Sequence, residues 1–116
     1  MVTALPVLRS HLHRLSELAR LANPDGHQLQ AEFLAAQQHF QHQVMPLAEP
    51  YPSGQPMLTE MNRTLRLLAM DVTFLLAARQ PTTAQQRQRQ MGDKLTQLLG
   101  FCEALEQAIA AAAPDP

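Results

Sequence analysis

The placement of proline constrains the fold of this sequence more than any other feature. Prolines lie near the start, in Asn23-Pro24-Asp25-Gly26, four times between residues 46 and 56, after Gln80 and at the C-terminus. Because proline breaks helices and restricts the residue before it, these positions mark boundaries. Four long segments remain, at residues 4–22, 27–48, 57–79 and 83–112, and we predict one helix for each.

Each segment carries apolar residues at spacings of three and four, the pattern of helices that pack at small crossing angles. The four series are Leu5, Leu8, Leu12, Leu15, Ala19 and Ala22; Leu29, Phe33, Ala36, Phe40, Val44 and Leu47; Leu58, Met61, Leu65, Leu68, Val72 and Leu75; and Met91, Leu95, Leu98, Cys102, Leu105 and Ile109. None of the segments shows the strict alternation of a strand. We predict an all-α fold over residues 1–116, an antiparallel up-down-up-down four-helix bundle forming one domain.

Local signals place the connections between these helices. Residues 23–26 form a tight turn, which favours antiparallel neighbours, and Thr83 with Gln86 resembles a capping box. Residues 46–56 form the one long connection, stiffened by four prolines. We expect the alanine run at residues 110–113 to be a fraying helix end, followed by a short disordered tail at 113–116.

Composition narrows the classes of protein. The chain has 116 residues and a formal charge of −1, which argues against the strongly basic face of a general nucleic-acid-binding protein. No stretch approaches the ~18 apolar residues of a membrane-spanning helix, and the N-terminus lacks the apolar core of a signal peptide. We therefore expect a cytoplasmic protein that binds no nucleic acid and does not insert into membranes.

Residues that could carry chemistry lack the partners that chemistry needs. No Glu precedes a His by three residues, as di-iron bundles require, so His39 and His42 are interpreted as solvated surface residues. His11 and His13 lack the Lys-Gly pair that accompanies phosphotransfer histidines. Cys102 occupies a core position with no adjacent cation to lower its pKa. We predict no catalytic site, no cofactor and no metal, and hence a protein that is not an enzyme.

The third helix is apolar on two faces. One face carries Met61, Leu65, Leu68, Val72 and Leu76, and nearly opposite, close to Arg63, lie Leu67, Met70, Phe74 and Ala77. A four-helix bundle covers only the inward half of each member, so the second face is predicted to contact another chain, with Phe74 as the anchor. The alternative is that residues 46–56 or the C-terminal tail fold over it.

Charge is also unevenly distributed. Residues 21–62 contain acidic residues and no Lys or Arg, whereas residues 63–94 contain five Arg and one Lys against two Asp. Three interpretations of this separation are open: the basic region attracts an acidic partner, the charges pair between neighbouring helices of the bundle, or they form a solvated face. Asp71 and Arg79 are alternatively interpreted as fixing the third helix against the region of Arg87.

One stretch resembles a known family. It comprises Arg63-Thr64-Leu65-Arg66-Leu67-Leu68, Asp71-Val72-Thr73-Phe74-Leu75, Ala78-Arg79-Gln80-Pro81 and Gln86-Arg87, with Gln43-Val44-Met45-Pro46-Leu47-Ala48 upstream and Gly100-Phe101-Cys102 downstream. Over roughly residues 29–105 the chain resembles the cyanobacterial PatD family, small proteins linked to heterocyst frequency and to the division protein FtsZ. The first helix offers only a generic amphipathic match.

The resemblance implies a non-enzymatic regulator of cell division and heterocyst frequency that binds FtsZ and modulates its filament assembly. Matching positions carried over as a candidate protein-binding surface are Arg63, Arg66, Leu67, Met70, Phe74, Arg79 and Arg87. The alternative function is a homo-oligomeric helical scaffold or adaptor with a different protein partner, in which the outer face of the third helix forms a homodimer.

Overall fold

The computed structural model describes residues 3–112, which form four long α-helices and no strand. These helices are α1 (Ala4–Ala19), α2 (Gly26–His39), α3 (Gln55–Ala77) and α4 (Pro81–Ala112). The predictions of an all-helical chain and of four helices are confirmed. The predicted disordered tail at 113–116 lies outside the described residues.

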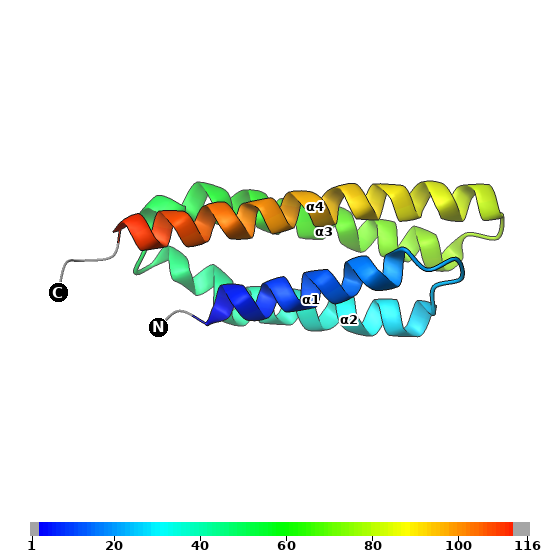
Figure 1. Ribbon diagram of the computed structural model, residues 1–116, viewed down its shortest axis with the longest axis horizontal. Coiled ribbons are helices and arrows are strands. Elements are labelled where there is room, and N and C mark those ends of the chain that lie inside the picture. The colour runs from blue at the N-terminus through cyan, green and yellow to red at the C-terminus, as the bar shows by residue number, and fades with distance from the viewer. Residues whose placement is uncertain (1–2, 113–116) are drawn as a thin grey trace.

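The four helices lie along the long axis of a molecule of 56 × 20 × 18 Å (Figure 1). In Figure 1 the chain reverses direction between consecutive helices. Helix α1 packs against α2 and α4, and α3 packs most extensively against α4. This path is consistent with an antiparallel up-down-up-down bundle, which stays a prediction.

The core is built from the apolar series that the sequence predicts. All six residues of the fourth series are buried, as are the first five of each of the others. The last residues of the other series differ: Ala22 is exposed in the turn after α1, while Leu47 and Leu75 are partly buried near helix ends. The spacing of three and four therefore predicts burial well except where a helix ends and its wheel no longer applies.

The two short turns begin their following helices in different ways. Asp25 caps α2, because its Oδ1 accepts hydrogen bonds from the backbone N–H groups of His27 at 2.9 Å and Gln28 at 3.3 Å. Helix α4 begins at Pro81, whose missing N–H costs nothing in the first turn of a helix. Thr83 therefore lies inside α4, and the predicted capping box with Gln86 is wrong.

The second predicted helix, 27–48, is a regular α-helix only as far as His39. It continues as a π-helical turn, η1 (Phe40–Val44), and a 3₁₀ turn, η2 (Met45–Ala48). Pro46 has no N–H to donate to the carbonyl four residues earlier, so the α-helical ladder cannot run through it. The single α-helix predicted over this range is therefore wrong beyond His39.

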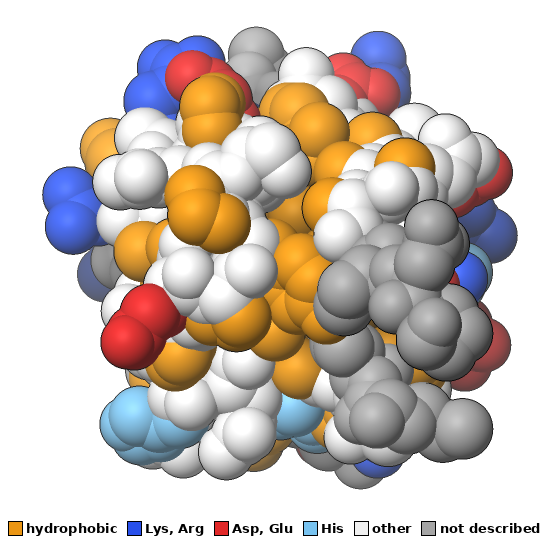
Figure 2. All heavy atoms as spheres, turned by 90° about the vertical axis from the view of Figure 1, so that its left-hand side faces the viewer, with side chains coloured by type: hydrophobic (Ala, Val, Ile, Leu, Met, Phe, Trp, Pro, Cys, Tyr) orange, Lys and Arg blue, Asp and Glu red, His pale blue; other side chains and the backbone are white. Residues whose placement is uncertain are grey.

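The proline-rich connection covers one end of the core. It contains η2 and a second 3₁₀ turn, η3 (Pro52–Gly54), and its partly buried Met45, Leu47 and Tyr51 pack against the core. Figure 2 views the molecule from this end and shows apolar side chains gathered across it. The connection is thus ordered and packed, and it enters α3 two residues earlier than predicted, at Gln55.

Candidate functional site

The outward face of α3 carries the apolar residues that the sequence singles out. Leu67, Met70 and Phe74 are 39%, 53% and 45% exposed, and we call these three residues the outer stripe. From Leu67 to Phe74 the helix rises through seven steps of 1.5 Å, about 10 Å. Large apolar side chains gathered on the face of a helix that points away from the core are a typical feature of a contact surface.

The segment 46–56 does not cover the outer stripe. It leads into α3 at Gln55, and Phe74 lies nineteen residues further along, about 28 Å at 1.5 Å per residue. The described end of α4 lies at the same distant end, because Leu105 packs beside Gly54. Within residues 3–112 the outer stripe is therefore open to a partner.

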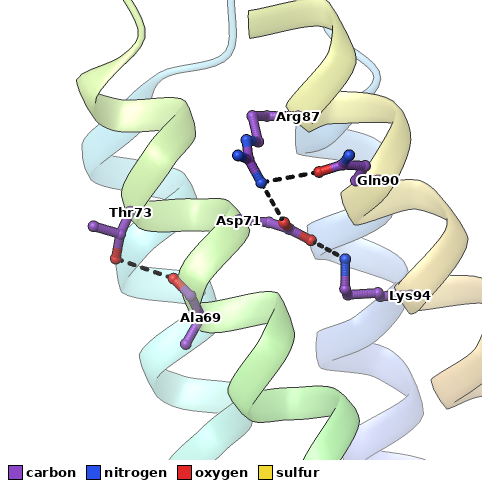
Figure 3. A network of polar contacts seen from close by, with 6 residues as sticks. All are labelled: Ala69, Asp71, Thr73, Arg87, Gln90 and Lys94. Atoms are coloured by element: carbon purple, nitrogen blue, oxygen red, sulfur yellow. Dashed lines mark hydrogen bonds and ion pairs between the residues drawn. The ribbon is translucent and has the colours of Figure 1, made fainter. Parts of the chain in front are cut away.

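Arg87 of α4 lies over the ring of Phe74, the last residue of the outer stripe. Its guanidinium carbon is 4.4 Å from the centre of the Phe74 ring, a cation–π arrangement. Its Nη1 donates hydrogen bonds to Gln90 Oε1 at 3.0 Å and to Asp71 Oδ1 at 3.4 Å (Figure 3). The Arg87 side chain thus contacts Phe74, Asp71 and Gln90, and these contacts fix the position of its charge beside Phe74.

Asp71 anchors this network from within the interface of α3 and α4. The residue is only 3% exposed, and its Oδ2 accepts from Lys94 Nζ at 2.5 Å while Oδ1 accepts from Arg87 (Figure 3). The prediction that Asp71 fixes α3 against the region of Arg87 is confirmed. Arg79 takes no part in it, because no ion pair joins Arg79 to Asp71 among residues 3–112.

The remaining predicted site residues are divided between two places. Arg63 lies on α3 one turn before Leu67 and pairs with Glu60 at 3.4 Å, and Arg66 is exposed on the same helix. Arg79 follows the end of α3 and lines a groove at the turn end of the bundle, beside Pro24 and Leu76. The structure therefore brings together the outer stripe and Arg87, flanked by Arg63 and Arg66, and sets Arg79 apart.

Leu76 departs from the prediction that it belongs to the buried face of the third helix. It is 43% exposed and lies against Gly26 at the start of α2, where its Cδ2 leaves no room for a Cβ on the glycine. The bundle core has ended at this level, so Leu76 packs on the neighbouring turn. Gly26 thus allows a close approach of α2 and α3.

The acidic region 21–62 and the basic region 63–94 form few ion pairs with each other. Across the described 110 residues, 3–112, the one ion pair between the acidic region 21–62 and the basic region 63–94 joins Glu60 and Arg63. Glu32 instead contacts His11 and Arg14 of α1. The basic region therefore keeps an excess of positive charge around the outer stripe.

Comparison with known proteins identifies the family. Residues 7–101 match the CRR41 C-terminal domain. The chain belongs to the CRR41 C-terminal domain family. No curated protein and no solved structure matches it.

The part of the chain that matches the CRR41 C-terminal domain contains the whole outer stripe and its polar network. It also includes Gln90 and Lys94, which sequence reasoning missed as members of the site. A signal for them exists, because Arg87, Gln90 and Lys94 follow one another at spacings of three and four and so share one side of α4. That Asp71 of α3 accepts from both Arg87 and Lys94 is not visible in the sequence.

The histidines of this family member correct an expectation. His11 Nδ1 donates to Glu32 Oε1 at 2.8 Å, and His39 Nε2 donates to the Ala4 carbonyl at 2.6 Å. Both side chains are part-buried between α1 and α2, so the interpretation of His39 as a solvated surface residue is wrong, whereas His42 is exposed. Sequence spacing alone could not show that α1 and α2 bring these groups together.

Residues 3–112 contain neither a cluster of metal-ligating side chains nor a membrane-spanning helix. No three His, Cys, Asp or Glu side chains come close enough together to hold a metal ion. None of the described helices combines the length and the apolar character needed to cross a bilayer.

Cys102 is buried in the core and should be unreactive while the protein is folded. Burial, and then the negative charge of Glu106, raise the pKa of its thiol from 9.0 to about 12, with Arg9 acting in the opposite direction. Only the thiolate is nucleophilic. We expect a thiol reagent at pH 8 to label Cys102 at least about a hundredfold more slowly in native than in guanidinium-denatured protein. Equal labelling rates would contradict the buried position.

The raised pKa of Cys102 also makes the stability of the protein depend on pH. Folding favours the neutral thiol, so this contribution to the free energy of unfolding is complete below pH 9 and is lost as the pH rises from 9 towards 12.

Proposed function

We propose that the protein is a non-enzymatic regulator of cell division and heterocyst frequency, which binds FtsZ through the outer stripe of α3 and modulates FtsZ filament assembly. The observation that carries the docking surface is the open face of α3, where Phe74 is nearly half exposed and Arg87 lies over its ring. The identity of the partner comes from the resemblance to the PatD family. That resemblance includes the segments 71–75 and 86–87, which contribute Asp71, Phe74 and Arg87.

The proposed mechanism is stoichiometric. A partner that covers the outer stripe removes Leu67, Met70 and Phe74 from water, and such apolar and aromatic anchors supply most of the energy of small interfaces. Arg63 and Arg66 flank the outer stripe and raise the rate of encounter with an acidic surface. Occupation of that part of FtsZ then changes how filaments associate, and no catalytic group is needed.

The proposal also includes the topology of the helices and the location of the protein in the cell. We treat the fold as an antiparallel up-down-up-down four-helix bundle, which is supported by the chain reversals in Figure 1 and by the packing of α1 on α2 and of α3 on α4. A rigid bundle holds the outward face of α3 in one conformation before a partner arrives, which lowers the entropic cost of binding. Binding to FtsZ implies a cytoplasmic protein.

Assembly of purified FtsZ tests this function. We expect the protein to co-sediment with FtsZ filaments in proportion to its concentration until it saturates, and to change light scattering during assembly. The protein alone, centrifuged under the same conditions, is the control. Unchanged scattering together with no co-sedimentation would contradict the proposed function.

A further inference from the structure

We propose that the outer stripe binds an acidic amphipathic segment of a partner protein, with a carboxylate of that segment on the guanidinium of Arg87 beside the ring of Phe74. This inference rests on the proposed function in taking the outer stripe as a docking surface, but it does not depend on FtsZ as the partner.

The polar network next to the outer stripe contains more positive than negative charge. Asp71 supplies one carboxylate, and Arg87 and Lys94 supply two cations. Gln90, the other group in the network, is neutral. A partly buried cluster with an excess cation is stabilised when an anion completes it, because attraction between charges is stronger away from bulk water.

Arg87 is prepared for such an anion. Both of its hydrogen bonds use Nη1, and in the described part of the chain Nε and Nη2 donate to no acceptor. The side chain is 32% exposed, so part of it is open to a partner. A guanidinium edge with two parallel N–H groups matches a carboxylate, and charge-assisted bonds of this kind are about twice as strong as neutral ones.

The place of Arg87 over Phe74 determines what should accompany the carboxylate. A partner that reaches the guanidinium also reaches the exposed ring, with Met70 one turn earlier on the same face of α3. Apolar and acidic residues on one side of a short helix meet both requirements at once. Asp71 and Gln90 act here as positioning residues, since they hold Arg87 over the ring.

A second copy of this chain fits the surface less well. A two-fold contact places the same patch on both partners, so Arg63, Arg66 and Arg87 would meet the same cations. The outer stripe is also only about 10 Å long, whereas a stable dimer buries about 800 Å² on each partner. A lipid surface is disfavoured for a similar reason, because an interfacial helix needs a long continuous apolar face.

Two synthetic helical peptides test this inference. Both carry the same leucine face, flanked by glutamates in one peptide and by lysines in the other, and binding to the full chain is followed by fluorescence anisotropy. We expect the acidic peptide to bind at least about tenfold more tightly than the basic one at low salt, and the difference to shrink as salt is added.

Variants of two arginines on α4 identify the receptor. Arg87→Ala should weaken binding of the acidic peptide about tenfold, and Arg87→Lys less, because it keeps the charge and loses the fork. Arg87→Ala leaves the pair of Asp71 and Lys94 in place, so the fold should persist, as circular dichroism can verify. The matched control is Arg89→Ala, since Arg89 is exposed on α4 beside the groove that Arg20 and Gly92 line.

Several outcomes would overturn the inference. They are equal binding of the two peptides, equal losses in Arg87→Ala and Arg89→Ala, an Arg87-dependent dimer in sedimentation velocity, or Arg87-dependent binding to anionic phospholipid vesicles without binding of the acidic peptide. Binding of the acidic peptide without co-sedimentation of FtsZ would overturn only the proposed function. Co-sedimentation of FtsZ without binding of the acidic peptide would overturn only this inference.

Discussion

Phe40→Ala should lower the free energy of unfolding by about 3–5 kcal/mol, the usual cost of truncating a buried aromatic side chain. Phe40 is the largest fully buried side chain and lies where α2 passes into the π-helical turn η1. Its ring is fully buried, and the side chains around it can close the cavity left by truncation only in part. Urea unfolding followed by circular dichroism at 222 nm measures the change.

Leu34→Ala is the matched control for this loss of packing. Leu34 lies on α2, like the residues that lead into Phe40, but it is 45% exposed. We expect a change within about 0.5 kcal/mol, because alanine favours a helix and little apolar contact is removed. A loss below about 1 kcal/mol in Phe40→Ala would show that the η1 segment is not part of the core.

Asp71→Asn should destabilise the protein by about 2 kcal/mol. The substitution keeps the size of the side chain and removes the only carboxylate of the network, so Arg87 and Lys94 are left beside an amide. Breaking a buried ion pair by removing one partner costs 3–5 kcal/mol, and we expect less because both cations are partly exposed and can turn towards water. Thermal and urea unfolding at neutral pH measure the effect.

Asp93→Asn serves as the control for the change of charge. Asp93 is exposed on α4, and no ion pair to it is found within residues 3–112. Removal of an exposed carboxylate should change stability by less than about 0.5 kcal/mol. Equal effects of the two substitutions would mean that Asp71 does not hold α3 and α4 together.

Most of the fold follows from patterns that lie close together in the sequence. Apolar spacing predicts the buried residues of all four helices, and proline placement predicts three connections. Two errors are local, at Pro46 and at Pro81, and the others occur where a contact between distant segments decides the outcome. Leu76 packs on Gly26, fifty residues earlier in the sequence, and no helical wheel contains that information.

The candidate site was also only partly predictable from the sequence. Exposure of the outer stripe could be predicted, because a helix in a bundle buries only one side. The stacking of Arg87 on Phe74 and the contact of Asp71 with Lys94 depend on how α3 is aligned against α4. That alignment is set by packing along the whole interface, so the sequence could name Phe74 and Arg87 as candidates without placing one over the other.

The central claim, that the outer stripe is the docking surface, is tested most directly by titrating FtsZ with two variants. Phe74→Glu and Leu34→Glu each place a charge on a side chain that is 45% exposed, the first in the outer stripe and the second on α2. Both should stay folded. We expect Phe74→Glu to weaken binding at least about tenfold, as for an aromatic anchor, and Leu34→Glu to leave it unchanged. Unchanged affinity in Phe74→Glu, or an equal loss in Leu34→Glu, would contradict the claim.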